Sequence, residues 1–223
     1  MTKHLVLLSG GMDSTVLVAH TIAVGINVEA LAVDYGQRHR TELVHARQVA
    51  DTLGIRLDVL DLSSLQQHLT GSALTDLEVQ VPDGHYAADS MRATIVPNRN
   101  SILVMAAVGI AQSREIPVVA TAVHAGDHHI YPDCRPGALQ AMANLALTCT
   151  EGRVTVTAPF VQWTKTRIVQ RGAAIAAPLS LTWSCYRGGT VHCGTCGTCN
   201  ERREAFREAD VSDPTTYLQG ANS

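Results

Sequence analysis

The sequence predicts an α/β fold in which a parallel sheet carries helices on both faces. Short runs typical of β-strands alternate with segments of helical periodicity from the first residues onward, which is the pattern of such a sheet. The 223 residues are 46% hydrophobic and 17% charged, enough for one sizeable core but too few for two full domains. Four cysteines crowd between Cys185 and Cys199, which predicts a small C-terminal metal clip beside the main fold.

Five strands and five helices are expected. The strands, chosen for β-type composition, are residues 4–8, 27–34, 56–62, 117–123 and 154–159. The helices, chosen for apolar positions at helical spacing, are residues 15–24, 41–53, 100–112, 136–148 and 165–177. Thr164 is placed to cap the last helix, and Glu42 is expected on the polar face of the second. The polar stretches 66–97 and 182–200 break the alternation, and connections of that length are usually lids or binding loops.

The composition argues against two classes of partner. The formal charge of −3 and the 4% of aromatic residues provide neither the basic surface nor the stacking platform of a protein that binds nucleic acid. The longest apolar run, residues 102–111, is about half of the ~20 residues that span a bilayer, and the first residues lack a secretory pattern. We therefore expect a cytoplasmic protein without a nucleic-acid or membrane partner.

A glycine-rich turn follows the first expected strand and leads into a helix. Its residues are Ser9, Gly10, Gly11, Met12, Asp13 and Ser14. Free backbone N–H groups and the helix dipole favour an anion at such a place. The turn is not a Walker motif, because Asp13 stands near the position of the required lysine. A carboxylate beside a polyphosphate needs a cation between them, so Asp13 is interpreted as a Mg²⁺ ligand or a positioning group. The alternative is a turn that merely joins strand to helix, capped by Asp13 or Ser14.

The order Ser-Gly-Gly-x-Asp-Ser after an N-terminal strand resembles the pyrophosphate loop, or PP-loop, of the adenine nucleotide alpha hydrolases. Members of that superfamily cleave ATP between its α- and β-phosphates. The resemblance implies a Rossmann-like ATP-binding domain over residues 1–180 and an adenylate product. The nucleotide-binding residues that we assign are Leu8, Ser9, Gly10, Gly11, Met12, Asp13, Ser14, Thr15 and Asp34.

Four further segments narrow the resemblance. Each alone is compatible with an ordinary loop or helix entry. Together, and in this order, they are similar to segments of the QueC family of 7-cyano-7-deazaguanine synthases, and the similarity runs from residue 5 to about residue 206. The segments are Asp34-Tyr35-Gly36-Gln37-Arg38-His39, Val96-Pro97-Asn98-Arg99-Asn100, Tyr131-Pro132-Asp133-Cys134-Arg135 and Thr182-Trp183-Ser184-Cys185-Tyr186.

This resemblance implies an ATP-dependent carbon–nitrogen ligase that works as a homodimer. Such an enzyme converts 7-carboxy-7-deazaguanine and ammonia to the nitrile by adenylating first the acid and then the amide, with Mg²⁺ bound to ATP. We assign catalytic roles to Asp13, Arg99 and Lys165. The substrate-binding residues that we assign are Tyr35, Gln37, Arg38, Asn98, Asp133 and Arg135. Two alternatives stay open: a tRNA-thiolating PP-loop enzyme, and a nucleotide-binding zinc module without catalysis.

The cysteine cluster has the spacing C-x7-C-x2-C-x2-C, formed by Cys185, Cys193, Cys196 and Cys199. Four thiolates suit a tetrahedral structural Zn²⁺, and Gly194 and Gly197 permit the tight turns that bring them together. The alternatives are buried cysteines without metal and an iron–sulfur cluster, whose common run ends in the C-x3-C-P that this chain lacks. We expect residues 181–223, with a C-terminal helix and tail, to pack on the ATP-binding domain.

Three histidines and two other cysteines are less informative. His124, His128 and His129 lie where the chain departs from the family's pattern, because His129-Ile130 replaces a common Ser-Gly pair. Surface or ring-stacking roles are favoured over a metal site for these histidines. Cys134 and Cys149 are expected to be small core residues rather than nucleophiles.

Overall fold

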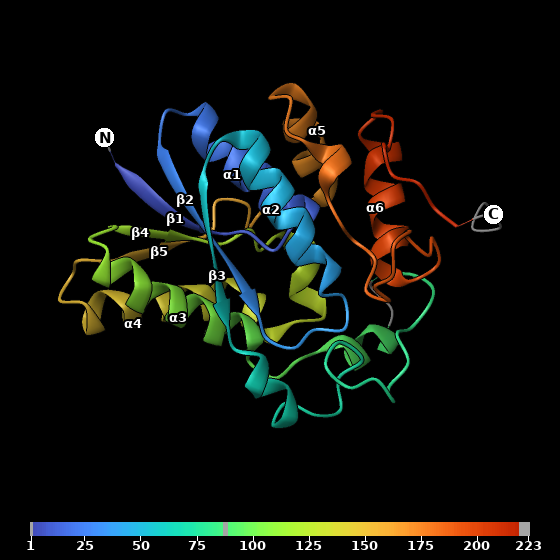
Figure 1. Cartoon of the computed structure of the whole chain (residues 1–223), viewed down its shortest axis with the longest axis horizontal. Helices are drawn as coiled ribbons and strands as arrows, with labels where there is room; N and C mark the ends of the chain where they lie inside the picture. Colours follow the sequence, from blue (N-terminus) through green and yellow to red (C-terminus); the bar gives the residue numbers. More distant parts are fainter. Residues whose placement is uncertain (1, 87–88, 219–223) are drawn as a thin grey trace.

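A computed structural model describes residues 2–86 and 89–218 of the chain (Figure 1). Its sheet has five parallel strands in the order β3-β2-β1-β4-β5. The strands are β1 (Lys3–Leu7), β2 (Asn27–Asp34), β3 (Arg56–Asp61), β4 (Val118–Ala120) and β5 (Thr155–Thr157). The predicted parallel α/β fold is confirmed. The chain order reverses between β1 and β4, and ligands of open parallel sheets bind outside the carboxyl ends of the strands at such a point.

Six α-helices belong to the described residues. They are α1 (Met12–Ala23), α2 (Thr41–Leu53), α3 (Arg99–Ser113), α4 (Pro136–Cys149), α5 (Lys165–Ala174) and α6 (Gly197–Glu208). Short 3₁₀ turns cover Ser63–Gln67, Asp89–Thr94, Ala125–His129, Pro132–Cys134 and Leu179–Leu181. Figure 1 shows α1, α2 and α5 over one face of the sheet and α3 and α4 over the other, while α6 stands beside α5. None of these helices combines the length and the apolar character that a membrane-spanning helix needs.

Alternation along β1 explains why both faces are covered. Leu5 is fully buried in a core with α3 and α4, whereas Val6 and Leu8 are buried in a second core with α1, α2 and α5. Because successive side chains of a strand point to opposite faces, an apolar strand such as this one needs a helical layer on each side. Phe206 of α6 joins the second core, so the C-terminal helix packs on the same hydrophobic layer.

Two predicted helix boundaries are wrong in an informative way. The first helix begins at Met12 rather than at residue 15, which puts Asp13 and Ser14 in its first turn, close to the positive end of the helix dipole. The helix that begins at Lys165 ends at Ala174 rather than at residue 177, because Pro178 disfavours helical geometry at the residue before it. The predicted N-cap of this helix is confirmed, since the Thr164 hydroxyl accepts a hydrogen bond from the Arg167 N–H at 3.2 Å.

The two irregular stretches pack against each other. Asp83 forms an isolated antiparallel bridge with Cys196 and an ion pair of 2.6 Å with Arg187. The Asn200 side chain donates to the Gly84 carbonyl oxygen at 2.7 Å. The described part of the first stretch therefore contacts the cysteine-rich stretch, although about a hundred residues separate them in the chain.

Candidate active site

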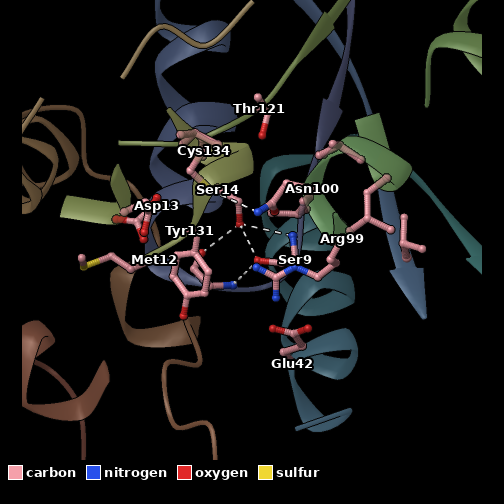
Figure 2. Close-up of a pocket in the computed structure, with 18 of the residues that line it drawn as sticks. Ser9, Met12, Asp13, Ser14, Glu42, Arg99, Asn100, Thr121, Tyr131 and Cys134 are labelled. Atoms are coloured by element: carbon pink, nitrogen blue, oxygen red, sulfur yellow. Dashed lines mark hydrogen bonds between the residues drawn. The ribbon is translucent and has the colours of Figure 1, made fainter. Parts of the chain in front are cut away.

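The glycine-rich turn after β1 is held by its own serines. The Ser9 and Ser14 hydroxyls lie 3.2 Å apart, and the Ser9 hydroxyl accepts from the Gly11 N–H at 3.2 Å (Figure 2). Gly10 has a φ of +89°, and a Cβ there would lie 2.1 Å from the Glu42 carbonyl oxygen of α2. The turn therefore needs glycine at position 10 both for its backbone conformation and for its close packing on α2.

A cavity of about 220 Å³ opens beside this turn, at the carboxyl ends of β1, β2 and β4. Nine residues assigned from the sequence line it: Leu8, Ser9, Gly11, Met12, Asp13, Ser14, Tyr35, Arg99 and Lys165. The opposite wall comes from the cysteine-rich segment and the start of α6, through Trp183, Ser184, Tyr186 and Thr198. The cavity thus lies between the sheet edge and the C-terminal segment.

Lys165 joins these two walls. Its Nζ lies 3.3 Å from Asp13 Oδ2 of the glycine-rich turn and 2.6 Å from Glu201 Oε2 of α6. Burial alone would raise the pKa of Asp13, but the neighbouring Lys165 ammonium and His124 hold it below its usual value. Burial alone would lower the pKa of Lys165, but the carboxylates of Asp13 and Glu201 outweigh burial and raise this pKa above its usual value. Asp13 is therefore a carboxylate and Lys165 an ammonium at neutral pH.

His124 extends this charged cluster. The residue is 2% exposed, and its Nε2 lies 3.8 Å from Asp13 Oδ2 and 3.5 Å from Asp127 Oδ1. The expected surface role is therefore wrong for His124. His128 is half-buried and His129 is exposed.

Arg99 supplies positive charge at another part of the cavity. Its guanidinium donates to the Tyr35 hydroxyl at 3.0 Å and lies over the rings of Tyr35 and Tyr131, at 5.6 and 5.9 Å from their centroids. Within the described residues no carboxylate pairs with Arg99 at ion-pair distance. Because a half-buried cation is costly without an anion, this place suits a carboxylate or phosphate of a ligand.

The other assigned residues do not line the cavity. The side chains of Arg38 and Arg135 donate to carbonyl oxygens of Asp76 and His128, at 2.8 and 3.1 Å. Asp133 accepts from the Asn100 N–H at 2.8 Å. Asp34 pairs with Arg40 and accepts a hydrogen bond from the Gly36 N–H, and the Gln37 amide donates to the Val33 carbonyl oxygen and to Glu42. Asn98 occupies the N-cap position of α3 without a capping side-chain hydrogen bond. Gly10 belongs to the glycine-rich turn, and Thr15 is buried near the start of α1. These residues hold the loops that carry the lining side chains.

Several lining residues were not assigned from the sequence. They include His39, Glu42, Tyr86, Asn100, Asp127, Tyr131, Trp183, Ser184, Tyr186 and Thr198. The expectation that Glu42 lies on a polar surface is wrong, because the residue is only 9% exposed. Its neighbours Gln37 and His39 belong to a motif already singled out, and Glu42 follows that motif by one helical turn, which is the signal that could have identified it.

The four clustered cysteines form a compact, buried set of donors. Their sulfur atoms all lie within 4.8 Å of one another. The backbone N–H of Cys196 donates to Cys193 Sγ at 3.3 Å. Four buried sulfurs at this separation fit a tetrahedral Zn²⁺. Of the two remaining cysteines, Cys134 is buried as expected, and burial raises the pKa of its thiol. The expectation of a core position is wrong for Cys149, which is exposed.

The strand order, the glycine-rich turn and the cavity at the strand ends define an α/β protein of the PP-loop class. Two solved structures share this fold. One is described as a predicted subunit of a tRNA methyltransferase from Methanocaldococcus jannaschii, with 14% identity, a TM-score of 0.51, and coverage of 99% of this chain and 94% of that chain. The other is an NMN synthetase from Francisella tularensis, with 12% identity, a TM-score of 0.50, and coverage of 94% and 87%.

Sequence comparison then defines the family. The profile described as "Queuosine biosynthesis protein QueC" matches residues 3–210, and the chain belongs to this family. Among its relatives, the 7-cyano-7-deazaguanine synthase of Ruegeria pomeroyi is 52% identical over 218 residues, covering 96% of this chain and 94% of the relative. The enzyme of the same name from Rhizobium meliloti is 53% identical over 219 residues, with 96% and 92% covered.

Proposed function

We propose that this chain is an ATP-dependent ligase that converts 7-carboxy-7-deazaguanine and ammonia to 7-cyano-7-deazaguanine. The single observation that carries the proposal is the cavity in which the glycine-rich turn, the Asp13–Lys165 pair and the half-buried Arg99 come together. Identities of about 50% over nearly the whole chain to enzymes named for this product support the choice of substrate.

The chemistry explains why such a site needs ATP. A carboxylate is a poor acyl donor, because expelling oxide or hydroxide is prohibitive at neutral pH. Transfer of AMP to a carboxylate oxygen makes that oxygen part of a good leaving group, and ammonia then displaces AMP to give the amide. A second adenylation at the amide oxygen, followed by loss of AMP, leaves the nitrile. Each round releases pyrophosphate.

The chain's own residues contribute mainly position and charge. Ser9, Gly11 and Ser14 face the pyrophosphate, and Lys165 offsets the negative charge that develops on it. Arg99 holds the substrate carboxylate against the α-phosphate, so that the reacting oxygen is in place. Gln37, Arg38 and the other assigned residues outside the cavity have a less direct role. They fix the loops that carry the side chains lining the cavity.

Two metals belong to the proposal. Asp13 Oδ1 is buried without a hydrogen-bond partner among the described residues, which fits a ligand of the Mg²⁺ that accompanies ATP. When bound, Mg²⁺ neutralises charge on the phosphate oxygens. The four clustered cysteines hold a structural Zn²⁺, and residues 181–223 form a zinc segment on the ATP-binding domain of residues 1–180.

One assay separates this proposal from its rivals. Purified protein is incubated with ATP, ammonia and 7-carboxy-7-deazaguanine, and the products are detected by mass spectrometry. We expect AMP and the nitrile. Formation of AMP only when tRNA is added would favour a tRNA-modifying enzyme, and nucleotide binding without turnover would favour a non-catalytic module. Release of ADP instead of AMP would overturn the proposed cleavage. Asp13→Asn should reduce AMP formation by about 100-fold, whereas Asp51→Asn, an exposed acid on α2, should not.

We also propose that the enzyme acts in the cytoplasm as a homodimer without a nucleic-acid partner. Light scattering after gel filtration tests the dimer, and activity without added RNA tests the independence from nucleic acid.

A further inference from the structure

Glu42 is a carboxylate at the cavity to which the proposed mechanism gives no role. Among the lining residues that the structure describes, three carry a carboxylate: Asp13, Asp127 and Glu42. Asp13 pairs with Lys165, and Asp127 accepts from the Tyr86 hydroxyl at 3.2 Å. Figure 2 shows Glu42 at a different end of the cavity from Asp13, with Ser9 and Ser14 between them. Glu42 is therefore separate from the charged cluster at the phosphate end.

The side chains in direct contact with Glu42 are those of Gln37 and His39, while Arg99 and Asp34 act on its pKa without an ion pair. Its Oε1 accepts from the Gln37 amide at 2.9 Å, and its Oε2 lies 3.5 Å from His39 Nε2. Burial lowers the pKa of His39 to about 3, so this ring carries no charge. Within the described parts of the chain no Lys or Arg nitrogen lies within ion-pair distance of Glu42. Burial accordingly raises the pKa of Glu42 to about 7, although Gln37 and Arg99 act in the opposite direction.

A buried carboxylate without a cation is costly, and it persists where a ligand supplies the missing donors. His39 Nδ1, which is also buried, has no hydrogen-bond partner in the described structure. Two polar groups at the same end of the cavity are thus incompletely satisfied. The surrounding lining is aromatic, through Tyr35 and Tyr186, whose rings suit the flat face of a base.

The geometry points to Glu42 as the residue that selects a guanine-type base, by accepting hydrogen bonds from its ring N–H and its exocyclic amino group. These two donors lie side by side on one edge of the base, and a carboxylate offers two acceptors at matching separation. An adenine-type edge presents an acceptor at the corresponding ring nitrogen, which a carboxylate repels. This inference rests on the proposed function and names the group that recognises its substrate.

The test is a binding measurement that needs no turnover. Calorimetric titration is performed with α,β-methylene-ATP present, using 7-carboxy-7-deazaguanine and an analogue that lacks the 2-amino group. Wild-type protein is expected to bind the analogue about 10–100-fold more weakly, because one charge-assisted hydrogen bond is lost. Glu42→Gln should weaken binding of the complete acid by a similar factor and should discriminate the two ligands by less than about 3-fold.

Two controls separate recognition from folding. Asp51→Asn, an equivalent change on the exposed side of α2, should retain the wild-type preference for the 2-amino group. Glu42→Gln should bind α,β-methylene-ATP within about 2-fold of wild type, since the substitution removes no phosphate contact. Loss of nucleotide binding together with loss of acid binding would indicate a purely structural residue and overturn the inference.

The outcomes also distinguish this inference from the proposed function. If wild-type protein binds and converts the acid while Glu42→Gln keeps the full preference for the 2-amino group, the function stands and the role of Glu42 is wrong. If wild-type protein fails to bind the acid, both are overturned.

Discussion

The two walls of the cavity differ in how they are built. The sheet-edge wall consists of the turn between β1 and α1, whose contacts join residues within a few positions of one another, such as Ser9 with Ser14. The clip wall consists of Trp183, Ser184, Tyr186 and Thr198, which belong to the segment that carries the four clustered cysteines. A local motif can specify the first wall, whereas the second depends on the cysteine cluster and on contacts across the chain.

Polar contacts connect the two walls. The Trp183 N–H donates to the Gly10 carbonyl oxygen at 2.9 Å, and Lys165 bridges Asp13 to Glu201. On α6, the fully buried Arg202 donates to the Thr182 hydroxyl at 2.7 Å, which ties the helix to the start of the clip. Glu201 follows the last clustered cysteine by two positions, so the proposed zinc site sets the place of a group that holds Lys165. The walls should therefore be separable by experiment but coupled in catalysis.

Removing the proposed zinc should have the largest effect of the changes considered. It should unfold the clip wall and leave the sheet-edge wall folded. A zinc–thiolate site contributes ~10–16 kcal/mol of apparent binding free energy, comparable to the whole stability of an ordinary domain. Chelation should abolish turnover and remove hydrogen-exchange protection from residues 182–200, while β1 to β3 stay protected. Exchange measured by mass spectrometry, with zinc counted by elemental analysis, checks this. Cys149→Ser, outside the cluster, should change neither quantity, and protection of residues 182–200 without metal would contradict the expectation.

Lys165→Met should sharpen the comparison by cutting the bridge between the walls. AMP formation is expected to fall by about 100–1,000-fold, because positive charge at the pyrophosphate is lost and Asp13 is left without its ammonium partner. The chain's other lysine, Lys3, pairs with Glu29 at the surface, so Lys3→Met is a matched control that should retain full activity. If AMP formation by Lys165→Met falls by less than 5-fold, Lys165 does not offset the charge that develops on the pyrophosphate.

Gly10→Ala should damage the sheet-edge wall. The added Cβ would meet the Glu42 carbonyl oxygen at 2.1 Å, at a φ of +89°, so either the turn or α2 must move. We expect a loss of ~3 kcal/mol in the free energy of unfolding, measured with denaturant, together with weaker ATP binding. Gly25 has a φ of +84° with nothing within 4 Å of its Cβ position, so Gly25→Ala isolates the backbone conformation and should cost ~1 kcal/mol. Equal losses in the two variants would show that close packing on α2 is unimportant.

The same contrast explains what the sequence could predict. The alternation of β-type runs with segments of helical periodicity predicted the parallel sheet, and the buried faces of β1 show why each side needs a helical layer. The spacing of the cysteines predicted their cluster. In both cases the relevant interactions are regular or short in sequence.

Glu42 and His124 show where this reasoning stops. Glu42 lies on the polar side of α2, and helical periodicity cannot tell a solvated face from one covered by another segment. Here the clip covers the start of α2, with His39 and Tyr186 rings 5.1 Å apart and a Cβ at Gly188 only 3.2 Å from the Arg38 carbonyl oxygen. His124 follows β4 and meets Asp13 through the strand order, which brings the ends of β1 and β4 together. Neither neighbour is close in sequence.

Thr164→Ala should have the smallest effect, because it loosens the helix that carries Lys165 without touching either wall. The Thr164 hydroxyl accepts from the Arg167 N–H at 3.2 Å, and loss of such a cap costs ~1 kcal/mol. For a chain of this size, the thermal midpoint should fall by about 2–4 °C, measured by calorimetry, with AMP formation nearly unchanged. Thr148→Ala is the matched control: this hydroxyl donates to the Asn144 carbonyl oxygen within exposed α4, where alanine is the better helix former. A fall in AMP formation larger than the loss of folded protein would show that the cap also sets the position of the Lys165 ammonium between the two walls.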